Sequence, residues 1–168
     1  MAKRIFSLPR IDELTDDQKK AYRLPKYGQY MIVGSPGTGK SVVALHRTEK
    51  FFENKECFFL TFNHVLSTAT KQLSTSDFDC QTAMSWFYDL YWKLVEGTYL
   101  NFDNMKMPER APHKPDYEQV VEKYKDLKKD FNNHQLVIDE GQDLPEGWYD
   151  CLIELGFENF FVVADQNQ

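Results

Sequence analysis

Short, continuously apolar runs alternate along this chain with segments whose apolar residues recur every three or four positions. An uninterrupted apolar run is typical of a strand that is covered on both faces, because a half-exposed strand would alternate with polar residues. The predicted strands lie at residues 30–33, 57–61, 78–82 (the weakest), 135–138 and 160–163.

The segments between most of these runs have a helical period. Pro25, Gly97 and Gly156 are residues of the kind that end helices. Strands separated by helices favour parallel pairing, so the sequence predicts an α/β fold: a mainly parallel sheet with helices on both faces. The predicted helices lie at about 15–24, 41–53, 64–73, 84–95, 116–130 and 146–155.

The length of 168 residues fits one ordinary domain. Residues 98–115 contain three prolines, mixed charge and little periodicity, which indicates an irregular surface connection. Together with the helical pattern that follows, this stretch predicts a short insertion at about 97–133. We therefore expect a single domain over residues 1–168.

Composition narrows the setting in which the chain works. With 20 Lys+Arg against 26 Asp+Glu the formal charge is -6, so any contact with nucleic acid has to be local. The 3 cysteines are far apart and form no C-x-x-C pair, which indicates a reduced, cytoplasmic protein without a zinc ribbon. No apolar run is long enough to cross a bilayer. We expect a cytoplasmic monomer that does not contact a membrane.

A complete G-x-x-x-x-G-K-[ST] phosphate loop follows the first predicted strand and precedes a helical pattern. Its glycines let successive backbone N–H groups point at phosphate oxygens, its lysine supplies a charge for the outer phosphates, and its last hydroxyl can hold Mg²⁺. The alternative is a Gly-rich turn without a ligand. The predicted nucleotide-binding residues are Gly34, Ser35, Pro36, Gly37, Thr38, Gly39, Lys40 and Ser41.

Two acidic residues end the predicted strand at 135–138, about a hundred residues after the phosphate loop. Asp139 is placed to hold Mg²⁺ together with Ser41, and Glu140 is placed to orient and deprotonate the water that attacks the γ-phosphate. The alternative is an acidic strand end that caps a following helix. The pair predicts hydrolysis of a nucleoside triphosphate, with Lys40 and Glu140 as catalytic residues.

The segment Asp139-Glu140-Gly141-Gln142-Asp143 resembles the D-E-x-Q-D box of UvrD/Rep-type superfamily I helicases. The resemblance implies a RecA-like P-loop NTPase fold, the N-terminal lobe of an ATP-dependent DNA helicase, with ATP and Mg²⁺ as cofactors. It also implies two partners: single-stranded DNA, or RNA, and a second RecA-like lobe with its arginine fingers. One lobe alone is expected to bind Mg-ATP, hydrolyse it very slowly and separate no strands.

The segment Leu14 to Ala21 resembles the Q motif of the same family, in which a glutamine recognises adenine. The resemblance assigns that role to Gln18. The same residues also form a capping box, in which Thr15 and Gln18 satisfy backbone donors at the start of a helix. The sequence leaves both interpretations open.

Two further segments resemble the motifs that line the single-strand track of the family. Thr61, Phe62 and Asn63 are similar to motif Ia, and residues 82–87, with Ser85 and Trp86, are similar to the T-x-H-S-F segment, although Met84 replaces its histidine. Aromatic rings at strand ends can stack on bases, and small polar side chains can bind phosphate. The alternative is that these aromatic residues pack in the core.

The last five residues, from Ala164 to Gln168, resemble motif III, whose final glutamine senses the γ-phosphate. Gln168 is therefore a third predicted catalytic residue. A function of a different class stays open beside the helicase lobe: a nucleotide-dependent switch that acts on a protein partner. A small-molecule kinase fits less well, because no arginine-rich lid is evident.

Overall fold

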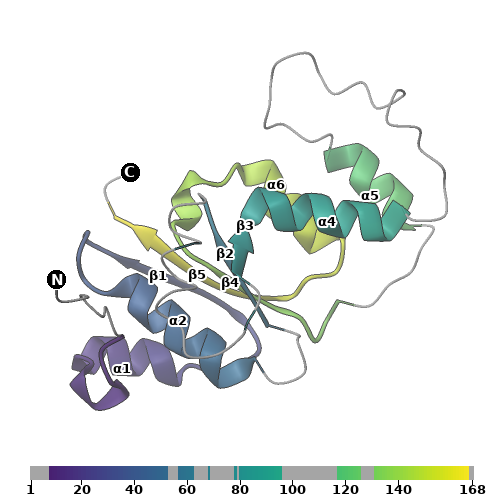
Figure 1. The fold of residues 1–168 in the computed structure, drawn as a ribbon. Helices are drawn as coiled ribbons and strands as arrows, with labels where there is room; N and C mark the ends of the chain where they lie inside the picture. The colour runs from purple at the N-terminus through teal and green to yellow at the C-terminus, as the bar shows by residue number, and fades with distance from the viewer. Residues whose placement is uncertain are drawn as a thin grey trace, which may run out of the picture.

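The strands form one 5-stranded sheet in the order β1-β5-β4-β2-β3, and every neighbouring pair is parallel (Figure 1). The computed structural model of the chain describes residues 8–52, 57–62, 68, 78, 80–95, 117–125 and 131–166, with only the backbone of residues 91–95, 119 and 123–124. The predicted α/β fold is confirmed. The strands are β1 (Gln29–Gly34), β2 (Cys57–Thr61), β3 (Cys80–Thr82), β4 (Gln135–Ile138) and β5 (Asn159–Asp165).

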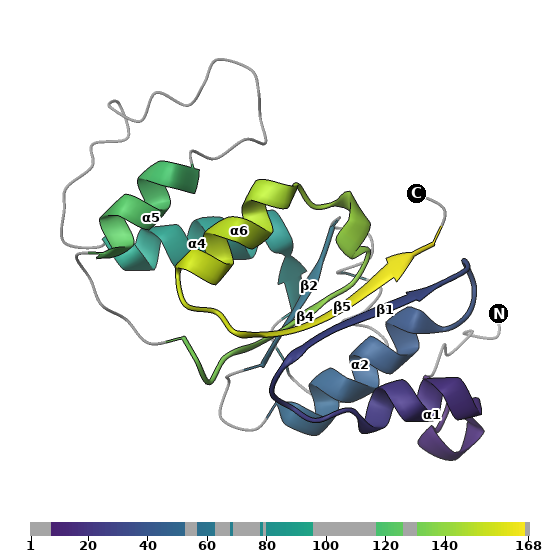
Figure 2. The same cartoon turned by 180° about the vertical axis from the view of Figure 1, so that it is seen from behind.

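Helices lie on both faces of this sheet (Figures 1 and 2). The first two helices cover one face, and the last three cover the other. Within the described ranges there are two short 3-10 helices: η1 (Ile11–Glu13), before the first α-helix, and η4 (Gly141–Asp143), after β4. The helices are α1 (Asp16–Arg23), α2 (Lys40–Phe51), α4 (Ala83–Val95), α5 (Tyr117–Lys125) and α6 (Glu146–Glu154).

The central strands are apolar throughout because their alternate side chains enter two separate cores. In β5, Phe161 and Val163 pack with α1 and α2, whereas Phe160 and Val162 pack with α4, α5 and α6. All four are buried. The apolar run of β5 is uninterrupted because helices cover both faces of the strand, so every side chain along that run has to be apolar.

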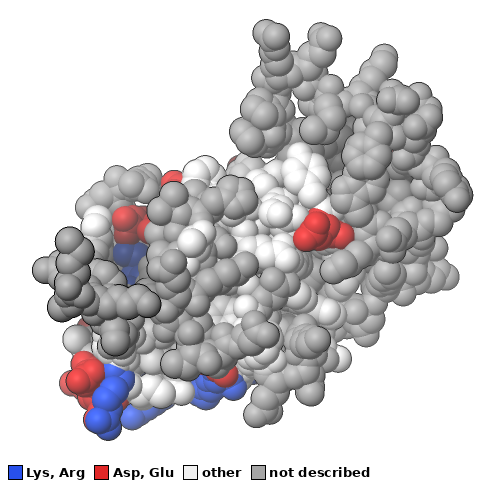
Figure 3. Space-filling model, in the orientation of Figure 1, with Lys and Arg blue, Asp and Glu red and all other residues white. Residues whose placement is uncertain are grey.

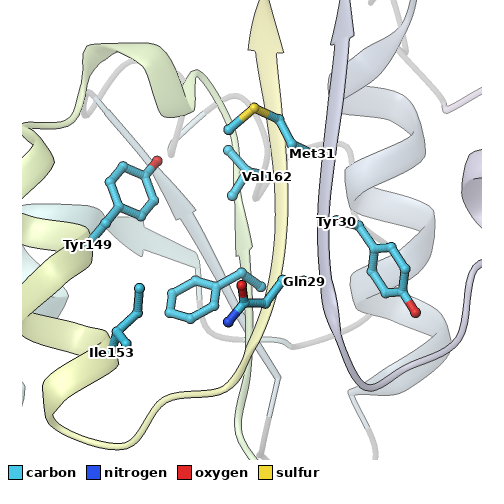
Figure 4. Close-up of a pocket in the computed structure, with 7 residues that line it drawn as sticks. Gln29, Tyr30, Met31, Tyr149, Ile153 and Val162 are labelled. Atoms are coloured by element: carbon cyan, nitrogen blue, oxygen red, sulfur yellow. The ribbon is translucent and has the colours of Figure 1, made fainter.

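Strand β1 departs from the two-sided covering that its apolar sequence predicts. Tyr30 and Ile32 pack on the α1–α2 side, but Met31 and Val33 point to the other face and are 68% and 52% exposed. Figure 4 shows Met31 beside Val162, with Tyr30 on the opposite side of the strand, at a groove between β1, β5 and α6. Helix α6 covers β4 and β5 and leaves this face of β1 open.

A buried arginine of α2 binds the carboxyl end of helix α1. Arg47 of α2 donates hydrogen bonds to the carbonyl oxygens at the end of α1, including 3.3 Å to Ala21 and 2.7 Å to Leu24. Its guanidinium also lies 4.2 Å from the ring centroid of Phe161. Burial lowers the pKa of Arg47 to about 10, so the side chain stays charged at neutral pH. These contacts cap α1 and fix it beside the loop that follows β1.

For the elements that the structure describes, the predicted boundaries agree with the observed ones to within a few residues. Strands β1 and β5 are longer than predicted, and the weak third strand begins at Cys80. Of the predicted helix at 116–130, residues 117–125 are helical, and Val120 and Val121 are buried in the core. The predicted helix at 64–73 and the irregular part of the insertion lie almost entirely outside the described residues. Within the described ranges no helix is long and apolar enough to span a bilayer.

Candidate functional site

The candidate site lies along one edge of the sheet, where the carboxyl ends of all the parallel strands meet. The phosphate loop follows β1, Asp165 ends β5, and the acidic pair follows β4, so these three segments lie next to one another. The candidate nucleic-acid residues follow β2 and β3, farther along the same edge. Crevices at this edge are where open parallel sheets bind ligands.

The phosphate loop has the backbone geometry that an anion cradle needs. Gly37 and Gly39 have positive φ angles of 78° and 77°, which only glycine adopts without strain. Gly39 is also the N-cap of α2, so the free N–H groups of the first helical turn face the loop. A Cβ on Gly39 would lie 2.5 Å from the side-chain nitrogen of Gln18. The loop backbone therefore has the shape of a phosphate cradle, and its conformation favours glycine at positions 37 and 39.

Lys40 lies across the mouth of the loop and is largely buried. Its ammonium donates hydrogen bonds to the carbonyl oxygens of Gly34 and Ser35, each at 3.1 Å. It also forms an ion pair with the carboxylate of Asp165 at the end of β5. The side chains of this pair are only 10% and 13% exposed. A charge placed here acts at the point where the outer phosphates of a bound nucleotide would lie.

Ser41 and Asp139 meet although 98 residues separate them in the sequence. The Ser41 hydroxyl donates to Oδ1 of Asp139 at 3.0 Å, and the N–H of Glu140 donates to the same oxygen at 3.2 Å. Burial raises the pKa of Asp139 to about 6, an increase that the hydrogen bond from Ser41 opposes. A hydroxyl and a carboxylate at this separation form a donor set of oxygens that suits Mg²⁺.

Glu140 has an unusual backbone. Its φ of 56° and ψ of 45° place it in the left-handed region, and it is the one non-glycine residue there among those described. A bulky residue in this region is strained, and such strain concentrates at functional sites. The side-chain amide of Gln142 donates to Oε2 of Glu140 at 2.7 Å. The carboxylate is thereby held by a polar partner.

Gln18 makes both kinds of contact that its sequence context suggests. Its side-chain oxygen accepts from the N–H of Thr15 at 2.8 Å, and its N–H donates to the Thr15 hydroxyl at 3.3 Å, which completes the capping box of α1. Its side-chain nitrogen donates to the carbonyl oxygen of Thr38 at 2.8 Å. The capping box is confirmed, and Gln18 additionally lies against the phosphate loop.

Two of the predicted nucleic-acid contacts are buried. Thr61 is fully buried at the end of β2, so its side chain cannot reach a ligand from solvent. Trp86 is 6% exposed and packs against Phe58, Trp148 and Phe157. Because these rings occupy its faces, Trp86 serves as a core residue and does not offer a stacking platform in this structure.

Two other predicted contacts are accessible at the same edge. Phe62 follows β2 and is 45% exposed. Ser85 is exposed in the first turn of α4, where its N–H donates to the Thr82 hydroxyl at 3.2 Å. Because Thr61 and Thr82 are paired in the register of β2 and β3, Phe62 and Ser85 follow neighbouring strand ends. Both therefore lie at the same edge of the sheet, while Asn63 and Gln168 lie outside the described residues.

The sequence alone assigns no role to two residues that the structure places in the site, Asp165 and Gln142. Asp165 pairs with Lys40, and Gln142 connects Glu140 to β5 by accepting from the N–H of Asp165 at 3.1 Å. Both belong to segments that resemble helicase motifs, but neither has a local pattern that reveals its partner. The signal that would have found Asp165 is its position at a strand end next to the phosphate loop, which requires the strand order.

Comparison with known proteins identifies the kind of domain. A family model described as an AAA domain matches residues 18–168. The matched range begins at Gln18 and includes the phosphate loop, the acidic pair and the end of β5. No curated protein matches the chain.

Proposed function

The chain belongs to the AAA domain family and is a P-loop ATP-binding domain of helicase type, and from this premise we propose that it is the N-terminal RecA-like lobe of a UvrD-like DNA helicase. The observation that carries the proposal is the bond between Ser41 and Asp139 at 3.0 Å, because it joins the phosphate loop to the acidic end of β4. Two separate sequence motifs thus form one site. The proposed ligand is Mg-ATP.

The phosphate tail is proposed to lie over the loop between β1 and α2. The N–H groups at the start of α2 and the ammonium of Lys40 offer donors to the β- and γ-phosphates. Gln18 of α1 lies against the loop at Thr38, and its amide is proposed to turn from there to an adenine edge. This position supports a preference for ATP.

The Ser41 hydroxyl and the Asp139 carboxylate are the residues that would hold Mg²⁺, Ser41 directly and Asp139 through water. Bound there, the cation would neutralise charge on the β- and γ-phosphates. Glu140 is proposed as the general base: its carboxylate orients the attacking water and accepts its proton. The hydrogen bond from Gln142 keeps this carboxylate in place at 2.7 Å.

A single strand of DNA is proposed to lie along the ends of β2 and β3, beside the nucleotide. Phe62 offers an exposed ring for stacking, and Ser85 offers a hydroxyl at a helix start for phosphate. Asn63 would extend this track, and Gln168 would sense the γ-phosphate. The net charge of -6 favours such a local track over a broad basic surface. On the face shown in Figure 3, the described Lys and Arg side chains lie beside described Asp and Glu side chains.

Catalysis in this class also needs arginines from a second lobe, which contribute on the order of 10³- to 10⁵-fold in rate. Residues 1–168 alone are therefore expected to bind Mg-ATP, to hydrolyse it very slowly and to separate no strands. A steady-state phosphate-release assay with and without single-stranded DNA tests this. Fast turnover stimulated by DNA would show that the site is complete without a second lobe.

The role of Glu140 has its own test. Glu140→Gln keeps the side-chain size and a partner for Gln142 but cannot accept a proton, so residual hydrolysis should fall by about 100-fold or more while ATP binding persists. Single-turnover hydrolysis and equilibrium binding are measured on the same preparation. Asp150→Asn, an exposed change on α6, is the matched control. Unchanged turnover in Glu140→Gln would refute the assignment of the base.

A further inference from the structure

The ion pair between Lys40 and Asp165 occupies a side chain that the proposed nucleotide site needs for phosphate binding. Lys40 is the residue whose ammonium is proposed to bind the outer phosphates. In the structure that ammonium contacts the Asp165 carboxylate as well as two loop carbonyl oxygens. Asp165 takes no part in holding Mg²⁺ or in activating water in the mechanism above.

The carboxylate of Asp165 is held in place by the sheet. Asp165 is the last residue of β5 and is paired in register with Gly34, the last residue of β1. The N–H of Gln166 donates to the Gly34 carbonyl oxygen at 3.2 Å, and the N–H of Asp165 donates to Gln142. The strand end therefore presents one acidic side chain at the mouth of the phosphate loop.

A carboxylate and a phosphate oxygen are both anionic acceptors, and each binds an ammonium by a charge-assisted hydrogen bond. They compete for the donor hydrogens of Lys40, because two of its three hydrogens already face Gly34 and Ser35. The pair is also largely buried, so solvent screens it less than a surface ion pair.

We propose that Asp165 is an internal competitor for phosphate: it occupies Lys40 until the tail of the nucleotide displaces it. This inference rests on the proposed function of the same site. Displacement costs binding free energy, so the apparent affinity for ATP is lower than the loop alone would give. Asp165 is thus a positioning residue: it lowers the affinity for ATP by holding the ammonium of Lys40.

Displacement of Asp165 from Lys40 also affects Glu140, the proposed base. Asp165 and Glu140 are bonded to the same side chain, since Gln142 accepts from the N–H of Asp165 and donates to Oε2 of Glu140. A shift of the β5 end that frees Lys40 therefore moves an atom bonded to the Glu140 carboxylate. The structure assigns Gln142 to this connection between phosphate binding and water activation.

The test is a calorimetric titration of wild type and Asp165→Asn with Mg-ATP. The asparagine has nearly the same shape but no charge, so Lys40 is released and ATP should bind about tenfold more tightly. Asp165→Glu keeps the competing charge and should stay near the wild-type affinity. Asp150→Asn changes the net charge equally, far from the loop in α6, and controls for general electrostatics.

The outcomes separate the two hypotheses. If wild type binds Mg-ATP and Asp165→Asn binds equally or more weakly, the competitor role of Asp165 is wrong while the nucleotide site stands. If folded wild type binds no ATP, the proposed function itself fails. Circular dichroism verifies that each variant is folded, and Asp165→Ser replaces Asp165→Asn if the latter does not fold, with the same expected gain.

Discussion

At the scale of single residues, the site contains a buried carboxylate and a strained backbone, both of which are energetically unfavourable. Asp139 is 3% exposed, and its charged form is costly there, yet its proposed role beside Mg²⁺ requires that charge. Glu140, next to it, has a strained backbone conformation. The buried carboxylate and the strained backbone both lower the stability of the fold. Such destabilising features are typical of functional sites.

The cost of Asp139 has a pH signature. Its pKa of about 6 lies above the ordinary 3.8, so between about pH 4 and 6 the folded protein holds a proton that the unfolded chain has released. Stability from this group is therefore complete below pH 4 and is lost as the pH rises through 6. Without Mg²⁺, Asp139→Asn should raise the free energy of unfolding at pH 7 by about 1–3 kcal/mol.

The measurement is urea unfolding of both proteins at pH 4 and pH 7 in the presence of a chelator. The difference in the free energy of unfolding between wild type and Asp139→Asn should be present at pH 7 and close to zero at pH 4. A variant that is less stable at both pH values would show that the hydrogen bond from Ser41 outweighs the buried charge.

At the scale of elements, the proposed nucleotide site depends on how α1 is attached. Arg47 binds the carbonyl end of this helix from α2, and Gln18 at its other end contacts the phosphate loop. Helix α1 has only one buried residue, Ala21, so the arginine contacts replace much of the apolar packing that other helices use. Polar anchoring thus places Gln18 beside the loop.

Arg47→Lys tests this anchoring. A lysine keeps the charge but cannot bind several carbonyl oxygens with a planar fork, so the free energy of unfolding should fall by about 2–4 kcal/mol. Arg23→Lys, an exposed change in α1, should stay within about 0.5 kcal/mol of wild type. Chemical denaturation measures both. Equal stability of the three proteins would mean that α1 is held by other contacts.

Much of this arrangement could be predicted from the sequence, because buried parallel strands and the phosphate loop both have strong local signatures. All five strands were predicted, and so were the residues that meet at Ser41 and Asp139. The open face of β1 could not be predicted, because Met31 and Val33 are exposed although they are as apolar as residues that a helix covers. A single sequence shows how apolar a strand is but not whether a helix lies over each face.

The contacts that the sequence could not predict depend on strand order or on local strain. Lys40 and Asp165 are separated by 125 residues, and only the adjacency of β1 and β5 brings them together. The left-handed backbone of Glu140 has no residue signal, because glutamate does not favour that region. Trp86 was ambiguous, since an aromatic residue near a strand end suits a core as well as a base.

At the scale of the whole molecule, the strand order arranges the functions along one edge. The proposed nucleotide-binding residues lie at the ends of β1, β5 and β4, and the proposed nucleic-acid contacts Phe62 and Ser85 follow β2 and β3. Asp139 is joined to the strand that leads to Phe62, because its N–H donates to the carbonyl oxygen of Leu60 at 2.8 Å. The proposed nucleotide and nucleic-acid sites therefore share a direct backbone connection.

The central claim is that one pocket binds the triphosphate of ATP through Lys40, Ser41 and Asp139. Isothermal titration of the folded wild type with Mg-ATP tests it most directly, with Lys40→Ala as the comparison. We predict clear heat of binding for wild type and an affinity lower by about 100-fold in the variant, whose fold stays intact. Folded wild type that takes up no Mg-ATP, or a variant that binds it equally well, would contradict the account.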